Sequence, residues 1–252
     1  MKDIINISTV QNRLLNMAVN IRDILENHGI EYMITFGTLL GAVRHRGFIP
    51  WDDDFDFFLF DESYDEAIKI LRGSLPDDLF VEDAESEPLY FHSWAHVKDL
   101  NSIAICEQFP QDNIYQHKGL SIDLYRAIRM DERDIDLFRL QQNLLYQERK
   151  KKAGVLSEAD YQTMVHSIEK DIISEKQKIK DFPSMGDAFG MVVKERIMYI
   201  NEVLPLKKYD FAGEQFYGPG NANAVLTRFF GNYMELPPEE KRDSHYSHVT
   251  FL

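Results

Sequence analysis

The densest group of reactive side chains in the sequence is the acidic run at residues 52–56. Four of its five positions are carboxylates, namely Asp52, Asp53, Asp54 and Asp56. Because strand side chains alternate between faces, Asp54 and Asp56 should project together while Phe55 and Phe57 enter the core. Two like charges so close repel unless a cation lies between them. Carboxylate oxygens suit Mg²⁺ or Mn²⁺, so the pattern predicts a divalent metal site.

The elements on either side of this run add a phosphate-binding turn and a third acid. Gly37 and Thr38 follow a β-prone stretch at 31–36 and open a short helix. Backbone N–H groups at such a turn attract phosphate oxygens. Residues 120–126 alternate again and put Asp123 on the polar face of a later strand. Three strand acids facing a phosphate turn are typical of phosphoryl or nucleotidyl transfer.

The rest of the chain predicts one α+β domain over residues 1–252. Apolar residues at helical intervals indicate a hairpin of two long helices, inserted at about 131–183. The core of the domain then occupies about 30–130 and 184–252, and a further helix is expected near 186–202.

Composition narrows the class of protein. Hydrophobic residues make up 44% of the 252 residues and aromatic residues 12%, which indicates a packed globule. The 28 basic and 42 acidic residues leave a formal charge of −14, which argues against nucleic-acid partners and broad attraction to anionic membranes. Any phosphate must therefore be bound by local groups.

The expected compartment is the cytoplasm. No stretch approaches the roughly 20 apolar residues of a membrane span, and the N-terminus lacks a signal-peptide core. Cys106 is the single cysteine, which fits a reducing compartment. We expect no integral membrane segment. Peripheral contact with a lipid-linked acceptor of the transferred group is left open.

Residues 37–56, GTLLGAVRHRGFIPWDDDFD, resemble the signature of the LicD family in the nucleotidyltransferase-fold superfamily. Residues 121–124 resemble the family's second acidic strand, and residues 230–234 with 237–238 its closing aromatic-glycine segment. The resemblance implies a nucleotidyltransferase-like mixed β-sheet flanked by helices. The helical insertion is poorly matched.

The family resemblance implies a Mg²⁺- or Mn²⁺-dependent transferase. It would move a phosphocholine-like group from a CDP-alcohol donor to a hydroxyl of a cell-surface glycan or teichoic acid precursor, releasing CMP. The implied catalytic acids are Asp54, Asp56 and Asp123, with Gly37 and Thr38 at the donor phosphates. Two alternatives stay open, a nucleotidyltransferase that releases pyrophosphate and an inert binding protein of the same fold.

Further residues complete the predicted site. Asp53 is a fourth possible metal ligand, although Asp52 and Asp53 could also cap a turn. The other predicted substrate contacts are Arg44, Trp51, Lys98 and His245. A choline donor would favour aromatic faces such as Trp51 or Trp94, and core packing is the competing explanation for both. The strand acids could instead form caps or salt bridges with Arg44 and Arg46.

Overall fold

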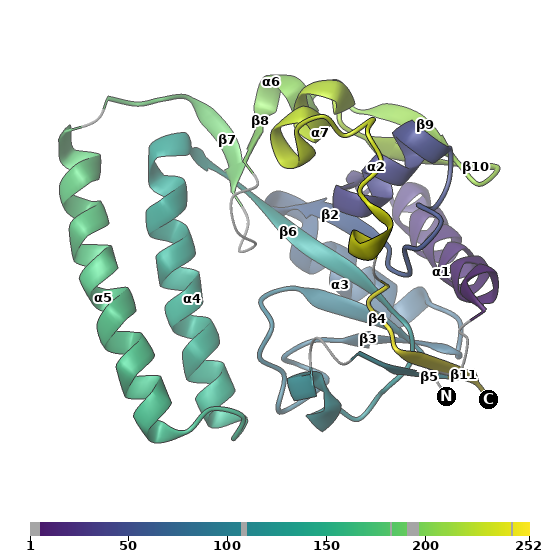
Figure 1. Ribbon diagram of the computed structural model, residues 1–252, viewed down its shortest axis with the longest axis horizontal. Helices are drawn as coiled ribbons and strands as arrows, with labels where there is room; N and C mark the ends of the chain where they lie inside the picture. Colours follow the sequence, from purple (N-terminus) through teal and green to yellow (C-terminus); the bar gives the residue numbers. More distant parts are fainter. Residues whose placement is uncertain (1–5, 107–109, 182, 191–196, 243) are drawn as a thin grey trace.

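The computed structural model describes residues 6–106, 110–181, 183–190, 197–242 and 244–252 (Figure 1). In these residues the helices are α1 (Ile7–Asn27), α2 (Phe36–His45), α3 (Asp61–Ser74), α4 (Ile135–Lys152), α5 (Glu158–Asp181), α6 (Ile200–Val203) and α7 (Ala222–Phe230). The strands are β1 (Tyr32–Ile34), β2 (Asp56–Phe60), β3 (Leu79–Glu82), β4 (Ala95–Asp99), β5 (Ser102–Ile105), β6 (Ser121–Asp131), β7 (Asp187–Gly190), β8 (Met198–Tyr199), β9 (Lys207–Phe211), β10 (Glu214–Gly218) and β11 (His248–Phe251). The described residues also include three short 3-10 helices, at Pro110–Ile114, Glu132–Asp134 and Glu239–Lys241.

Within the described residues, seven strands form one mixed sheet in the order β1-β2-β6-β4-β3, with β7 pairing with β6 and β8. Strands β2 and β6 run parallel, and the other neighbours run antiparallel. The register pairs Asp56 with Asp123, Asp123 with His96, and His96 with Glu82. Since directly paired residues point to the same face, one polar row crosses four neighbouring strands.

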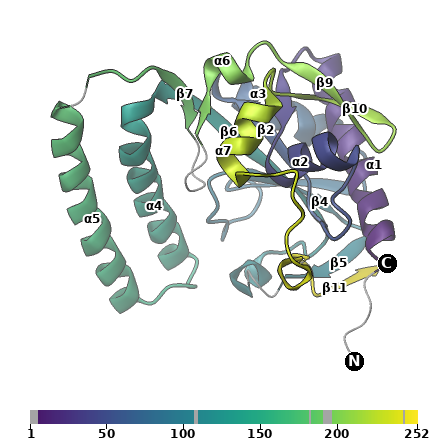
Figure 2. The ribbon, with the colours of Figure 1, turned by 45° about the horizontal axis from the view of Figure 1, so that its top comes forward.

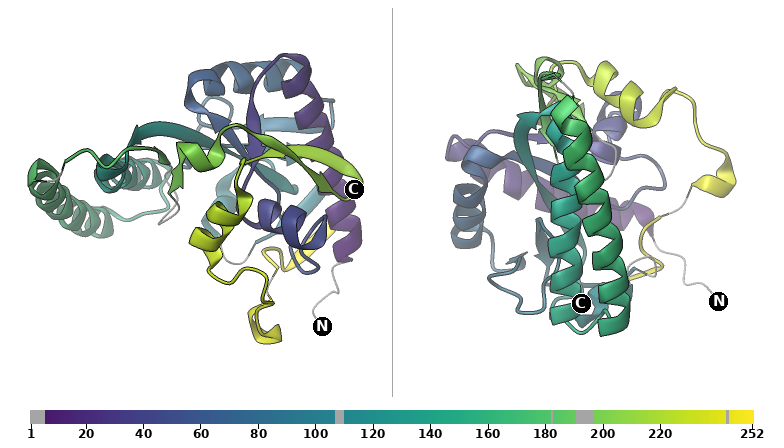
Figure 3. Two further views of the ribbon diagram at one scale, coloured as in Figure 1. Left: turned by 90° about the horizontal axis from the view of Figure 1, so that it is seen from above. Right: turned by 90° about the vertical axis from the view of Figure 1, so that its left-hand side faces the viewer.

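Helices cover both faces of this sheet, which confirms the predicted α+β class (Figure 3). Helices α1 and α3 pack together against one face, and α1 buries a stripe with helical spacing: Val10, Leu14, Met17, Ala18, Ile21 and Leu25. Helix α2 packs against β2 and α7 on the opposite side (Figure 2). None of the described helices has the length and apolar character needed to cross a bilayer.

A buried aromatic cluster packs around the acidic run. Phe55 and Phe57 are fully buried, as strand alternation predicts. The Phe55 ring lies 5.2 Å from the rings of Phe211 and Phe216, which belong to the β9-β10 hairpin. Such aromatic pairs fix orientation as well as burying apolar area. The backbone that carries the acids is therefore held by segments far apart in the sequence.

The long-helix hairpin is confirmed as α4 and α5, which stand beside the sheet as a separate pair (Figure 1). The helix expected near 186–202 is wrong, because β7, β8 and the short α6 occupy its described part, and residues 191–196 lie outside the described chain. The second half of β6 extends past its earlier partners, and β7 pairs with that free edge. Tertiary pairing has overridden the local helical pattern.

Candidate active site

The predicted acids meet at the end of the parallel strand pair. Asp56 begins β2, Asp54 lies two residues before it, and Asp123 is the third residue of β6. Asp54 and Asp123 line a cavity of about 390 Å³, called here the acid cavity. Lys98 and His245 line it too, so the structure unites four of the predicted residues. Asp56 is buried, at 4% exposure, directly beside Asp123 in the sheet.

Asp52 and Asp54 lie close enough for their negative charges to repel each other. Burial, with the nearby charge of Asp54, raises the pKa of Asp52 to about 8, and the two side chains hydrogen-bond each other. Burial also raises the pKa of Asp54, and the charge of Asp123 acts in the same direction against the opposing effect of His245. Asp54 Oδ1 is buried without a hydrogen-bond partner among the described residues. Crowded carboxylates and an orphaned oxygen fit a site built around a hard cation.

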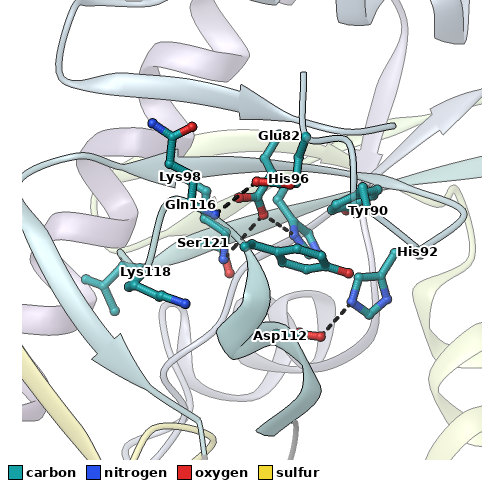
Figure 4. A network of polar contacts seen from close by, with 12 residues as sticks. Glu82, Tyr90, His92, His96, Lys98, Asp112, Gln116, Lys118 and Ser121 are labelled. Carbon is teal, nitrogen blue, oxygen red and sulfur yellow. Dashed lines mark hydrogen bonds and ion pairs between the residues drawn. The ribbon is translucent and has the colours of Figure 1, made fainter. Parts of the chain in front are cut away.

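Asp123 is held differently, by a polar row on the sheet. Its Oδ2 accepts a hydrogen bond from the Tyr125 hydroxyl at 2.9 Å, and its Oδ1 lies 3.1 Å from His96 Nε2. His96 Nδ1 faces the buried Glu82 carboxylate at 3.4 Å (Figure 4). Burial alone would raise the pKa of Asp123, but His96 and Tyr125 lower it below the ordinary value. Asp123 therefore remains a carboxylate, as a cation ligand must.

The first turn of α2 touches the acids. A Cβ atom on Gly37 would lie 2.8 Å from Asp52 Oδ2, so glycine is what permits this approach. Phe36, just before it, has a φ of 48°, an unfavourable angle for a side chain of this size. Thr38 is buried, and its hydroxyl accepts the N–H of Asp56 at 2.9 Å. Thr38 thus positions the acidic strand, whereas Gly37 brings backbone to the carboxylates.

Asp53 anchors the C-terminal segment. Its carboxylate is fully buried and accepts the backbone N–H groups of His245 at 2.7 Å and Tyr246 at 3.0 Å. His245 Nδ1 also lies 3.0 Å from Asp53, and this contact raises the pKa of His245 to about 9. Asp52, Asp53 and His245 each offer one ligand atom within 4.8 Å of the others. A protonated His245 acts as a counter-ion there, because only neutral imidazole binds a metal.

Asp53→Asn should lower the free energy of unfolding by about 2 kcal/mol, because one of the two accepting oxygens becomes an NH₂ group that faces a backbone N–H donor. Urea unfolding measures this change. Asp23→Asn is the matched control, since Asp23 forms a surface ion pair with Arg22 and should change stability by less than about 1 kcal/mol. Equal stability of the two variants would contradict the anchoring role.

Two predicted substrate contacts lie away from the acid cavity. Arg44 Nη1 donates to the carbonyl oxygen of Tyr233 at 2.6 Å, at the end of α2. The guanidinium of Arg242 lies over the Trp51 ring, with Arg242 Cζ 4.9 Å from the ring centre. Arg44 therefore ties helix α2 to the C-terminal region, and Trp51 does the same for the loop that leads into the acids.

Trp94, weighed above as an aromatic face for a choline donor, lines the acid cavity, as do four residues that were not among the predicted contacts: His92, His96, Lys118 and Tyr125. One signal was present in the sequence, because His96 lies two residues before Lys98 and shares its strand face. His92 lies outside regular strands and pairs with Asp112 at 3.1 Å (Figure 4). No periodicity could have located that pair.

The chain is similar to known proteins over the region that carries the predicted acids. Residues 29–123 match the family model described as LicD/FKTN/FKRP, nucleotidyltransferase domain. The chain is 23% identical to the lipopolysaccharide cholinephosphotransferase LicD of Haemophilus influenzae, over 94% of this chain and 95% of the relative. It is 26% identical to the uncharacterized protein RP689 of Rickettsia prowazekii (45% of this chain, 46% of the relative) and 30% identical to RT0683 of Rickettsia typhi (45% and 38%). The matched domain begins before Gly37 and ends at Asp123, so this part of the chain, which carries the predicted acids, is similar to the LicD family.

Proposed function

We propose that the protein transfers a phosphocholine-like phospho-alcohol group from a CDP-activated donor to a hydroxyl of a cell-surface glycan or teichoic acid precursor. The acid cavity carries this proposal, because it joins crowded carboxylates to cationic side chains in a chain of net charge −14. The name of the Haemophilus influenzae relative, a lipopolysaccharide cholinephosphotransferase, supports the same chemistry. The parallel β2-β6 pair that carries the acids supports a nucleotidyltransferase-like fold.

In this proposal the acids have distinct roles. Asp54, Asp56 and Asp123 would hold Mg²⁺ or Mn²⁺, and the bound ion would neutralise charge on the donor diphosphate. Lys98 and the protonated His245 add positive charge at the wall of the cavity. The N–H groups in the first turn of α2, beside Gly37, offer hydrogen bonds to phosphate oxygens.

The transfer step exchanges one P–O bond for another. The acceptor oxygen bonds to the distal phosphorus as the bond from that phosphorus to CMP breaks. The hydroxyl proton passes to Asp123, which is ionised beside His96 before the transfer. Its low pKa makes it a weak base, which is sufficient because phosphoryl transfer depends mainly on positioning and charge stabilisation.

Product analysis tests the proposal. The full chain, Mg²⁺ and CDP-choline, CDP-ribitol or CDP-glycerol are incubated with a glycan acceptor, and nucleotides are separated by anion exchange. CMP formed together with a modified glycan is the expected result. Release of pyrophosphate from a nucleoside triphosphate would instead identify a nucleotidyltransferase, and the absence of both products would indicate a binding protein.

A further inference from the structure

A second cavity lies beside the acid cavity, between helix α4 and the sheet. It has a volume of about 230 Å³ and is called here the hairpin cavity. Its lining comprises Asp61, Ser93, Trp94, Tyr125, Arg126, Ile128, Phe138, Gln142 and Arg149. Three of these, Phe138, Gln142 and Arg149, belong to α4. The helical hairpin therefore contributes a wall to a cavity next to the acids.

Two aromatic residues connect the cavities. Trp94 and Tyr125 line both of them, and their rings lie 5.0 Å apart. The Tyr125 hydroxyl donates to Asp123, so the ring that borders the hairpin cavity ends at a predicted catalytic acid. A ligand against this ring would lie within one side-chain length of Asp123.

The polar groups of the hairpin cavity are held in place. Arg126 forms ion pairs with Asp61 and Asp65, and its guanidinium lies over the Tyr64 ring. Positive charge on Arg126 is thus balanced by carboxylates. The carboxylates of Asp61 and Asp65 equal in number the guanidinium groups of Arg126 and Arg149, and this balance of charge around the hairpin cavity favours a neutral ligand.

The hairpin also fixes the segment that carries Trp94. Arg149 Nη1 donates to the carbonyl oxygen of His92 at 3.2 Å and to Ser93 Oγ at 3.4 Å. Tyr146, one turn earlier on α4, packs against Phe91 with ring centres 5.7 Å apart. Helix α4 thereby sets the position of the shared aromatic wall.

We propose that the hairpin cavity binds the sugar ring of the acceptor glycan, with the reacting hydroxyl directed toward Asp123. This inference rests on the proposed transfer function. Aromatic faces pack against the C–H faces of a sugar, and amide, carboxylate and guanidinium groups bond its hydroxyls. Trp94 and Tyr125 supply the first kind of contact, and Asp61, Gln142 and Arg149 supply the second.

Two adjacent glutamines of α4 provide the test. Gln142 lines the hairpin cavity, whereas Gln141 is exposed and does not. Transfer is measured with CDP-choline labelled in the choline group, Mg²⁺ and a deacylated lipopolysaccharide core oligosaccharide as the acceptor probe. Gln142→Trp should raise the KM for the oligosaccharide about tenfold or more and leave the KM for CDP-choline within about twofold, because it fills only the acceptor subsite. Gln141→Trp should change neither KM.

The outcomes separate the two proposals. An unchanged oligosaccharide KM in Gln142→Trp, or an equal rise in both KM values, overturns the acceptor subsite while wild-type transfer still stands. If the wild-type protein forms no labelled oligosaccharide, the proposed function is overturned, and the acceptor subsite with it. Phe138→Ala, a smaller change at the same wall, replaces Gln142→Trp if the thermal melt shows that the larger side chain prevents folding, and the same oligosaccharide-specific KM rise is expected.

Discussion

Asp54→Asn should lower kcat by about 10³-fold or more and at the same time raise the melting temperature of the metal-free protein. The loss of activity follows because the carboxylate is a predicted cation ligand at the acid cavity. The gain in stability follows because burial and the charge of Asp123 raise the pKa of Asp54, so the folded state disfavours its charge. Asparagine has nearly the same shape and removes that unfavourable charge. A gain on the order of 1 kcal/mol corresponds to a few degrees.

Both effects are measured on one preparation. Turnover is followed by CMP release, and melting is recorded in EDTA and again in millimolar MgCl₂. Mg²⁺ should stabilise the wild-type protein and have a much smaller effect on the variant, because ligand binding stabilises the native state by mass action. Asp23→Asn, at an exposed ion pair, controls for loss of one negative charge. Near wild-type turnover, or a lower melting temperature in EDTA, would contradict the role given to Asp54.

Asp123→Asn should abolish transfer to a similar extent but lower the stability of the protein. Here the folded state favours the charge, because His96 and the Tyr125 hydroxyl lower the pKa of Asp123 in spite of burial. The asparagine leaves His96 facing an amide at the same position. Loss of a hydrogen bond to a charged partner costs about 2 kcal/mol.

Urea unfolding of the two variants therefore tests the electrostatic description of the site through the sign of the change. In metal-free buffer, Asp54→Asn should unfold at higher urea than the wild type, and Asp123→Asn at lower urea. Shifts of the same sign would show that the two carboxylates occupy similar environments, contrary to their contacts. The activity loss, by contrast, is expected in both variants.

Local periodicity predicted the elements whose faces are set by neighbouring residues. Alternation placed Phe55 and Phe57 in the core and Asp123 on the polar face of β6. Helical spacing identified the α4-α5 hairpin within a few residues of its ends. These elements can be predicted from the sequence because each strand or helix buries one face, and that burial gives the apolar residues a regular spacing.

Local periodicity could not predict contacts between segments that are far apart in the sequence. The Asp53 carboxylate accepts hydrogen bonds from the backbone of His245 and Tyr246, which lie nearly 200 residues later in the chain. No spacing pattern in the sequence predicts these contacts. The same limit explains why β7 was expected as helix, since its pairing depends on the free edge of β6. Asp54, Asp123, Lys98 and His245 were named from their types, yet their meeting in one cavity depends on the sheet register and on the C-terminal segment.

Asp54, Asp56 and Asp123 are proposed to form one cation site that faces the donor phosphates. Crystals of the full chain grown with MnCl₂ and CDP-choline, and measured at the manganese absorption edge, test it most directly. We expect an anomalous peak at a manganese ion that is bonded to carboxylate oxygens of these three residues and to the donor diphosphate inside the acid cavity. A manganese ion bound only by Asp52, Asp53 and His245, or a diphosphate bound outside the acid cavity, would contradict it.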